Sequence, residues 1–221
     1  GHSGEYILNK ICEDGFAHYK QSVRIVEVLE KDGKGLNLTW EVRDGILNHR
    51  TSGHPSTLEG AIVRLSDKIA YINHDIDDAM RAGILTDSDI PKEISDILGS
   101  NHRDRINSLV TDMIFQTLDT GVLGMTAEVE QAMEALRSFM FERVYKNPVA
   151  KGEEVKARRI LQQLYEYYSK HPEAIPADFQ PQIDFEGMER VICDYIAGMT
   201  DKYAMYKYDE LFIPTAWQVR G

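Results

Sequence analysis

The sequence predicts an all-α fold, and three observations support this prediction. Apolar residues recur at spacings of three and four in most long segments, as they do on the buried face of a helix. Capping residues open one such segment and a glycine follows it, which are ordinary signals for the two ends of a helix. No segment alternates apolar and polar residues as a half-buried strand would, and no sequence repeat is present.

The first predicted helix covers residues 15–29, with Phe16, Tyr19 and Val23 among the residues of its apolar face. The paired glycines and charged residues of 30–35 then predict a turn. The other helices are predicted, in chain order, at 39–49, 58–82, 88–98, 103–119, 127–144, 153–171 and 185–203.

The helix at 58–82 has the clearest end signals. Ser56 is followed three residues later by Glu59, the spacing of a capping box, and an apolar periodic run begins there. Gly83 is the expected stop, because glycine readily adopts the left-handed conformation that ends helices.

Composition excludes several classes of protein. Hydrophobic residues make up 43% of the 221 residues and charged residues 28%, as in a globular domain, and no apolar run of about 18 residues predicts a membrane span. The net charge of −11 argues against a surface built for duplex nucleic acid. Cys12 and Cys193 lie far apart without a CxxC motif, so we expect a cytoplasmic protein without a disulfide.

The helix at 58–82 also carries the most informative polar face. At about 100° per residue, Leu65, Ile69 and Ile76 fall on one side and a mixed set of charged and polar residues falls on the other. A solvated surface is the ordinary explanation of such a face, but this mixture could bind a metal, a phosphate and a hydroxyl along one groove. The polar set comprises Arg64, Asp67, Lys68, Tyr71, His74, Asp75 and Asp78.

Two further candidates lie outside this helix. His2 and Glu5 are three residues apart, so a carboxylate could hold a proton-transferring imidazole in one tautomer; a surface ion pair is the alternative. Arg105, in the triplet Arg-Asp-Arg at 103–105, could bind phosphate or simply belong to the charged start of a helix. The remaining histidines show no mutual metal-ligand spacing and are expected to be structural: His18, His49, His54, His102 and His171.

Together these segments resemble the HD-domain deoxynucleoside triphosphate triphosphohydrolases, the bacterial dGTPase-like family. Residues 66–79 (SDKIAYINHDIDDA) are similar to the family's last metal-ligand helix. The other similar blocks are 16–22 (FAHYKQS), 35–43 (GLNLTWEVR) with 45–47 (GIL), 105–110 (RINSLV) and 195–201 (YIAGMTD).

The resemblance implies a role for individual residues of the long helix. Asp67 matches the last ligand of a divalent metal site for Mn²⁺ or Mg²⁺, and Lys68 matches a residue that contacts substrate phosphate. Tyr71 and Asp75 match residues that bind the deoxyribose, the ring packing where a 2′-hydroxyl would collide and the carboxylate accepting from the 3′-hydroxyl.

Outside the helix, His2 and Glu5 match a His-x-x-Glu pair whose histidine lies at the scissile phosphate ester. Arg105 would contact phosphate, and Tyr195 and Asp201 would line the site.

One part of the family pattern lies outside this sequence. The family's first metal histidine and its His-Asp pair precede the Gly-His-x-Gly-Glu stretch, and here that stretch forms residues 1–5. A tag scar would also begin Gly-His, but the resemblance favours a truncated or cleaved chain with three of four metal ligands upstream. We therefore expect this polypeptide alone to bind the ion poorly, because one carboxylate does not make a site.

The resemblance implies an HD-domain helical bundle with additional C-terminal helices, divided into a catalytic portion at 1–120 and a helical region at 121–221. The implied function is hydrolysis of a dNTP to deoxynucleoside and tripolyphosphate, in a cytoplasmic homo-oligomer with a dNTP activator and without membrane or duplex nucleic acid as partner. The alternatives are an HD phosphohydrolase acting on another nucleotide and a non-catalytic helical interaction or oligomerisation module.

Overall fold

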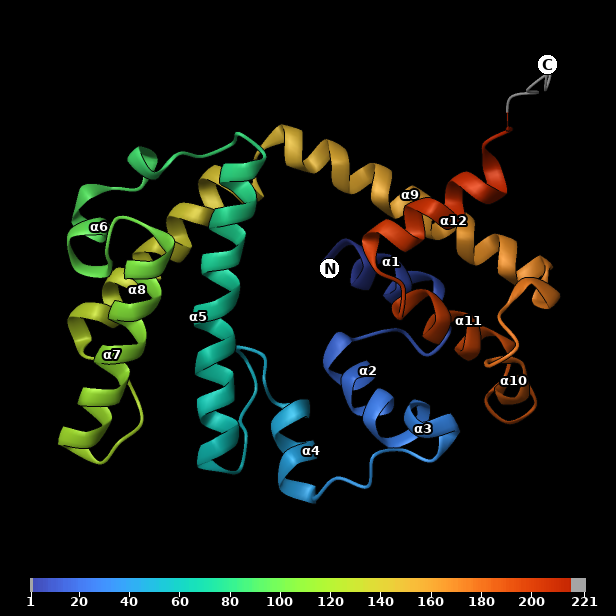
Figure 1. The fold of residues 1–221 in the computed structure, drawn as a ribbon, viewed down its shortest axis with the longest axis horizontal. Coiled ribbons are helices and arrows are strands. Elements are labelled where there is room, and N and C mark those ends of the chain that lie inside the picture. Colours follow the sequence, from blue (N-terminus) through green and yellow to red (C-terminus); the bar gives the residue numbers. More distant parts are fainter. Residues whose placement is uncertain (1, 216–221) are drawn as a thin grey trace, which may run out of the picture. The chain divides into compact units, whose positions relative to one another are not determined.

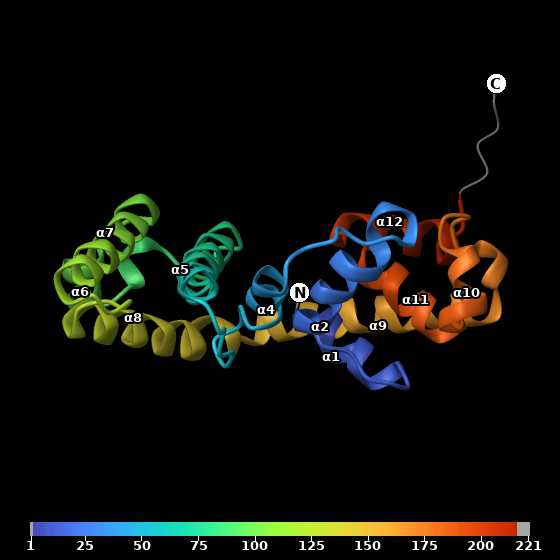
Figure 2. The same ribbon diagram turned by 90° about the horizontal axis from the view of Figure 1, so that it is seen from below.

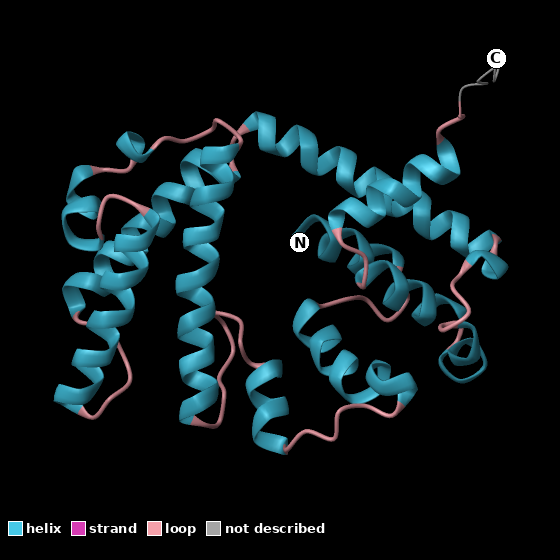
Figure 3. Cartoon of the chain, in the orientation of Figure 1, coloured by secondary structure: helices cyan, strands magenta, loops and turns pink. Residues whose placement is uncertain are grey.

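The computed structural model describes residues 2–215, and every regular element in that range is helical (Figure 3). This confirms the expected all-α class. The chain forms two compact units: the first comprises the described residues within Gly1–Gly35 and Gly152–Gly221, and the second comprises Leu36–Lys151. None of the helices described in 2–215 is both long and apolar enough to cross a bilayer.

The first unit combines the two ends of the chain (Figure 1). Its N-terminal part contains α1 (His2–Ile11), α2 (His18–Arg24), a π-helical turn at Ile25–Leu29 and the four-residue α3 (Glu30–Gly33). Its C-terminal part contains most of α9 (Pro148–Lys170), a 3-10 turn at Pro172–Ala174, α10 (Gln180–Glu186), α11 (Met188–Ala197) and α12 (Asp201–Phe212).

The core of the first unit joins these two parts. Leu8 of α1 is buried in one apolar cluster with Leu164 of α9 and with Val191 and Ile192 of α11. Burial of such side chains is the main favourable term in folding. The N-terminal helices are therefore held to the C-terminal ones by a shared core.

A disulfide joins Cys12 and Cys193 in the same core, which corrects the expectation that no disulfide is present. The two residues are 181 positions apart, but both are buried and their Cα atoms are 6.7 Å apart. The segments that carry the two cysteines come together only in the folded chain. Their wide separation in the sequence therefore did not predict that they are close in space.

The second unit contains α4 (Trp40–Leu47), α5 (Leu58–Arg81), a 3-10 turn at Asp87–Asp89, α6 (Lys92–Leu98), α7 (His102–Thr120), α8 (Ala127–Met140) and a π-helical turn at Phe141–Tyr145. Figures 1 and 2 both show α6, α7 and α8 side by side. Ile72 and Ile76 of α5 are buried with Leu98, Leu109 and Leu136 in its core. This packing leaves the opposite face of α5 for polar residues.

The start of α5 differs from its expected cap. Thr57, not Ser56, is the N-cap, and its hydroxyl oxygen accepts a hydrogen bond from the Gly60 N–H at 3.1 Å. The backbone N–H of Ser56 instead donates to the Asp44 carboxylate. At the other end Gly83 has a φ of +69°, which confirms it as the residue that ends the helix.

The predicted helix at 185–203 is wrong. Gly187 has a φ of +84° and separates α10 from α11, and Thr200 then caps a separate α12. Phe185, assigned to the apolar face of one continuous helix, is 88% exposed as a result. The apolar spacing continues across Gly187, so periodicity alone predicts one continuous helix there.

Candidate active site

The polar face of α5 carries four of the seven predicted site residues. Its first member, Asp67, is exposed, and no hydrogen bond or ion pair to it is recorded within residues 2–215. The Lys68 ammonium lies 3.8 Å from a carboxylate oxygen of Glu134 on α8. An anionic ligand could displace this long, half-exposed ion pair at little cost, because such pairs contribute little free energy.

Tyr71 and Asp75, one helical turn apart, are both half-buried. Asp75 accepts a hydrogen bond from the hydroxyl of Tyr145, which lies in the π-helical turn after α8. Burial, and then this hydrogen bond to a carboxylate, raises the pKa of Tyr145. The hydroxyl therefore stays protonated and fixes the position of the carboxylate.

Tyr145 was missed by sequence reasoning. It stands one residue beyond the predicted helix at 127–144 and 70 positions from Asp75, so no local spacing connects them. The π-helical turn that holds it is a kind of irregularity often found at functional sites, but the sequence does not reveal it.

Arg105 lies on α7, not on α5. Its Nε donates to the amide oxygen of Asn73 at 3.1 Å, and one terminal nitrogen is 3.6 Å from Asp87. Asn73 is two residues from both Tyr71 and Asp75, about 200° around the helix from each, so the structure does not bring Arg105 to their face.

The Arg105 side chain is only 1% exposed, and its two terminal nitrogens have no hydrogen-bond partner among the described residues. Burial lowers its pKa, although the neighbouring carboxylates of Asp87 and Asp77 oppose that shift. A buried guanidinium with two unused donor groups is costly unless something accepts from it.

His2 and Glu5 lie on α1, in the first unit, so their arrangement is described separately from that of α5. Glu5 accepts a hydrogen bond from the backbone N–H of His18 at 3.0 Å, and its other oxygen lies 2.9 Å from His18 Nδ1. Burial raises the pKa of Glu5, but these bonds outweigh it and the pKa is lowered. No hydrogen bond between His2 and Glu5 is recorded, and His2 is exposed.

His18 is the second residue that sequence reasoning missed, having been assigned a structural role with the other isolated histidines. It stands 13 positions from Glu5, across the turn between α1 and α2. The arrangement is a carboxylate–imidazole pair, the type of unit that can hold a proton at a defined nitrogen.

The other two predicted lining residues have different surroundings. Tyr195 is buried among aromatic rings, including Tyr168 and Phe179, and its hydroxyl lies 3.2 Å from that of Tyr203. Asp201 is exposed in the first turn of α12. The structure therefore places Tyr195 in the core of the first unit and Asp201 on its surface.

Residues 2–215 do not by themselves bring a full set of metal ligands together. Within 2–215, no three His, Cys, Asp or Glu side chains come close enough together to hold an ion. Mn²⁺ and Mg²⁺ prefer about six ligands, mostly oxygen. Asp67 fits one of those positions, because its carboxylate is accessible and no partner for it is recorded within that range.

Comparison with known proteins defines the class. Residues 123–210 match the family described as the phosphohydrolase-associated domain. The chain is 52% identical to a deoxyguanosinetriphosphate triphosphohydrolase-like protein of Caldanaerobacter subterraneus subsp. tengcongensis, over 98% of this chain and 64% of that protein. A protein of the same description from Geobacter sulfurreducens is 33% identical, over 97% of this chain and 69% of its own length.

The chain thus belongs to the class of proteins that contain a phosphohydrolase-associated domain, here within an all-α fold. Within that class it is a member of the deoxyguanosinetriphosphate triphosphohydrolase-like family. It spans 64% of the length of its relatives from Caldanaerobacter and from Clostridium tetani; the Clostridium protein is 44% identical to it.

Proposed function

We propose that the protein containing this chain hydrolyses a dNTP, with dGTP as the reference substrate, to deoxynucleoside and tripolyphosphate. The observation that carries the proposal is the polar face of α5, where an accessible carboxylate, a lysine, a tyrosine and a hydrogen-bonded carboxylate follow one another: Asp67, Lys68, Tyr71 and Asp75. The description of the relatives as deoxyguanosinetriphosphate triphosphohydrolase-like supports the proposed class of reaction.

Each of these groups suits one part of a dNTP. Lys68 would neutralise phosphate charge, and its weak pairing with Glu134 leaves it ready to do so. Asp75, fixed by Tyr145, would accept a hydrogen bond from the 3′-hydroxyl of the sugar, and the Tyr71 ring would pack against the sugar. Together they would favour a sugar that lacks the 2′-hydroxyl.

In this proposal, residues of α1 carry out the proton transfer. His2 would protonate the 5′-oxygen as the ester bond breaks, and Glu5, held by His18, would keep a negative charge beside the imidazole. Arg105 is proposed as a further phosphate contact, supported by its two unused nitrogens, for a ligand that reaches its buried position.

Asp67 is proposed as one ligand of a Mn²⁺ or Mg²⁺ ion. When bound, such an ion would polarise the α-phosphate and orient water. On the family resemblance alone, we further propose a cytoplasmic homo-oligomer with a dNTP activator.

The test is phosphorus NMR of the products that the full-length protein forms from dGTP with Mn²⁺. We expect tripolyphosphate without pyrophosphate or free phosphate, and we expect Asp67→Ala to abolish turnover while circular dichroism stays unchanged. Asp96→Ala, which removes an exposed carboxylate paired with Lys92 on α6, is the matched control and should remain active. Full activity of Asp67→Ala, or equal turnover of GTP and dGTP, would contradict the assignment.

A further inference from the structure

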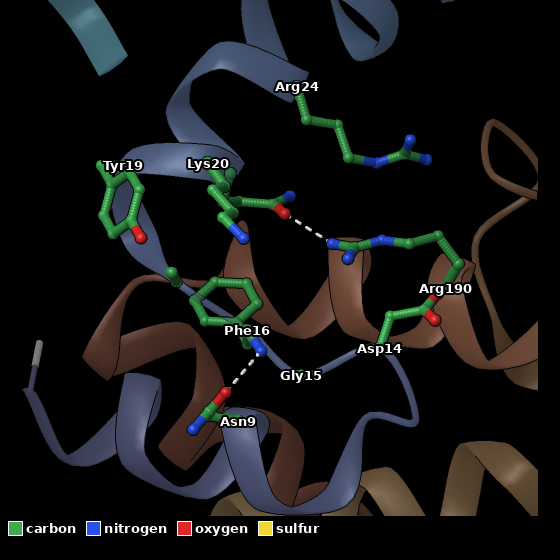
Figure 4. A pocket seen from close by; sticks show the side chains of 10 residues that line it. Asn9, Asp14, Gly15, Phe16, Tyr19, Lys20, Arg24 and Arg190 are labelled. Atoms are coloured by element: carbon green, nitrogen blue, oxygen red, sulfur yellow. Dashed lines mark hydrogen bonds between the residues drawn. The ribbon is translucent and has the colours of Figure 1, made fainter. Parts of the chain in front are cut away.

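The first unit contains a cavity of about 410 Å³ beside the turn between α1 and α2 (Figure 4). Its walls come from the end of α1, the turn, α2 and α11, all within that unit. The volume is within the range of small-molecule sites. None of the residues assigned above to dNTP hydrolysis lines it.

A network of hydrogen bonds and ion pairs holds the polar wall of the cavity. Arg24 and Arg190 both donate to the carboxylate of Asp194, at 2.8 Å and 2.7 Å for their closest nitrogens, and the Asp194 side chain has no exposed surface. Arg190 also donates to the amide oxygen of Gln21. These bonds hold one edge of each guanidinium group in place. Ordering the two groups would therefore cost little free energy when a ligand binds.

Among the described residues, the positive charge of the cavity that no ion pair balances lies mainly at Lys20. Arg24 is balanced by Asp194 and by Glu186 at 3.1 Å, whereas no ion pair or hydrogen bond of Lys20 is recorded with any residue of 2–215. Figure 4 shows the Lys20 side chain and the Arg190 guanidinium extending from two different helices into the view above the Phe16 ring. The lining carries three cationic residues and one carboxylate, Asp14, in a chain whose net charge is −11.

The remaining walls are partly apolar. Phe16 and Tyr19 contribute aromatic rings, and Asn9 and Gln21 contribute amides. Asn9 is already occupied, since its side-chain oxygen accepts from the Phe16 N–H at 2.9 Å, and this bond fixes the turn. The cavity thus offers cationic donors at one wall and ring surface at another.

We propose that this cavity binds a small phosphate-bearing anion, with the phosphate oxygens on the Lys20 ammonium and the outer edge of the Arg190 guanidinium. Oxyanions match both groups, since ammonium and guanidinium donors form charge-assisted hydrogen bonds with phosphate. The same chemistry could come from free inorganic phosphate or from the phosphate of a nucleotide whose base lies against Phe16 and Tyr19.

Calorimetry on the full-length protein tests this with three probes: inorganic phosphate, pyrophosphate and deoxyguanosine monophosphate. Saturable binding of at least one probe is expected, weakened about tenfold by Lys20→Gln and recovered by Lys20→Arg, because one charge-assisted hydrogen bond is lost and then replaced. Lys202→Gln removes an exposed lysine of α12 in the same unit and should leave binding unchanged.

The probes also separate the sources of phosphate. Tighter binding of the monophosphate nucleotide, still dependent on Lys20, identifies a nucleotide site, and equal or tighter binding of the inorganic anions identifies a phosphate site. Lys68→Gln, on α5, should leave binding at the cavity intact, whatever becomes of dNTP turnover. The proposal is overturned if no probe binds, or if Lys20→Gln binds as well as the Lys202→Gln control.

Discussion

The Asp194 carboxylate binds several side chains of the first unit at once. It accepts hydrogen bonds from Gln21, Arg24 and Arg190 on two helices that are about 170 positions apart in the sequence. Burial raises the pKa of Asp194, but these bonds outweigh it and lower the pKa below its ordinary value of 3.8. A charge of this kind stabilises the folded state only while all its partners are present.

Replacing this carboxylate should therefore be costly. Asp194→Asn should lower the free energy of unfolding by about 3–5 kcal/mol near neutral pH, because it leaves two guanidinium groups without their buried counter-charge. Urea unfolding followed by circular dichroism measures the loss. Asp184→Asn, at an exposed position of α10, should change stability by less than about 0.5 kcal/mol.

The effect should also depend on pH, in a direction that the lowered pKa determines. The charged carboxylate stabilises the fold above its ordinary pKa of 3.8, and this contribution is lost as the pH falls through the lower folded value. The difference in stability between Asp194→Asn and the unchanged protein should thus be constant above about pH 5 and should shrink toward pH 3. A constant difference down to pH 3 would contradict the assignment of the shift to Asp194.

Tyr145 allows a test of the sugar-binding proposal. Tyr145→Phe keeps the ring but removes the hydroxyl that donates to Asp75, so the carboxylate loses its fixed position. We expect kcat/KM for dGTP to fall about tenfold with little change in melting temperature. Tyr208→Phe is the matched control, since its hydroxyl donates to Gln163 in the first unit; equal kinetic effects of the two changes would argue against a role for Tyr145 in substrate binding.

At the scale of the element, Ser56 and Thr57 are neighbours at the start of α5 but have different roles there. Thr57→Ala should cost about 1 kcal/mol of stability, because the Gly60 N–H loses its acceptor. Ser56→Ala should cost much less, since the contact of Ser56 with Asp44 uses its backbone N–H and survives the change. Thermal unfolding of the two variants, measured in parallel, checks the prediction. A larger loss of stability for Ser56→Ala would indicate that Ser56, and not Thr57, caps the helix.

The helices that could be predicted are those whose signals are local. The end of α5 at Gly83 and the extent of α7 follow from glycine conformation and apolar spacing, and both agree with the structure. The break at Gly187 was missed because its signal, a single glycine, is also tolerated inside helices. The choice of Thr57 over Ser56 depends on Asp44, which belongs to another helix.

The residues of the candidate site also divide into those that local sequence signals predict and those that depend on tertiary contacts. Periodicity could place Asp67, Tyr71 and Asp75 on one face of a helix, because that is a property of the helix alone. Tyr145 and His18 could not be found in this way, since each meets its partner only after a turn or another helix intervenes. The predicted division into two functional portions at residue 120 remains a prediction. The two compact units of the folded chain meet after residues 35 and 151, a division that depends on tertiary contacts.

At the scale of the whole molecule, the disulfide ties together the two sequence segments that build the first unit. Cys12→Ala with Cys193→Ala should lower the stability of that unit by about 2–5 kcal/mol under oxidising conditions, because the link restricts the unfolded chain. Hydrogen exchange should show faster opening of α1 and α11, with α6 and α8 unchanged as the internal control. The same loss should follow when a reducing agent is added to the unchanged protein, and no difference between oxidised and reduced protein would contradict the link.

The shared core of the first unit also has a consequence for biosynthesis. A ribosome completes α1 long before it reaches α11, since Cys12 and Cys193 are 181 residues apart. Leu8 therefore has no Leu164 or Ile192 to pack against while the intervening chain is made, whereas the second unit is continuous and has all its helices as soon as residue 151 emerges. The second unit can thus fold before the first, while α1 lacks the buried partners of its apolar face until α11 has been synthesised.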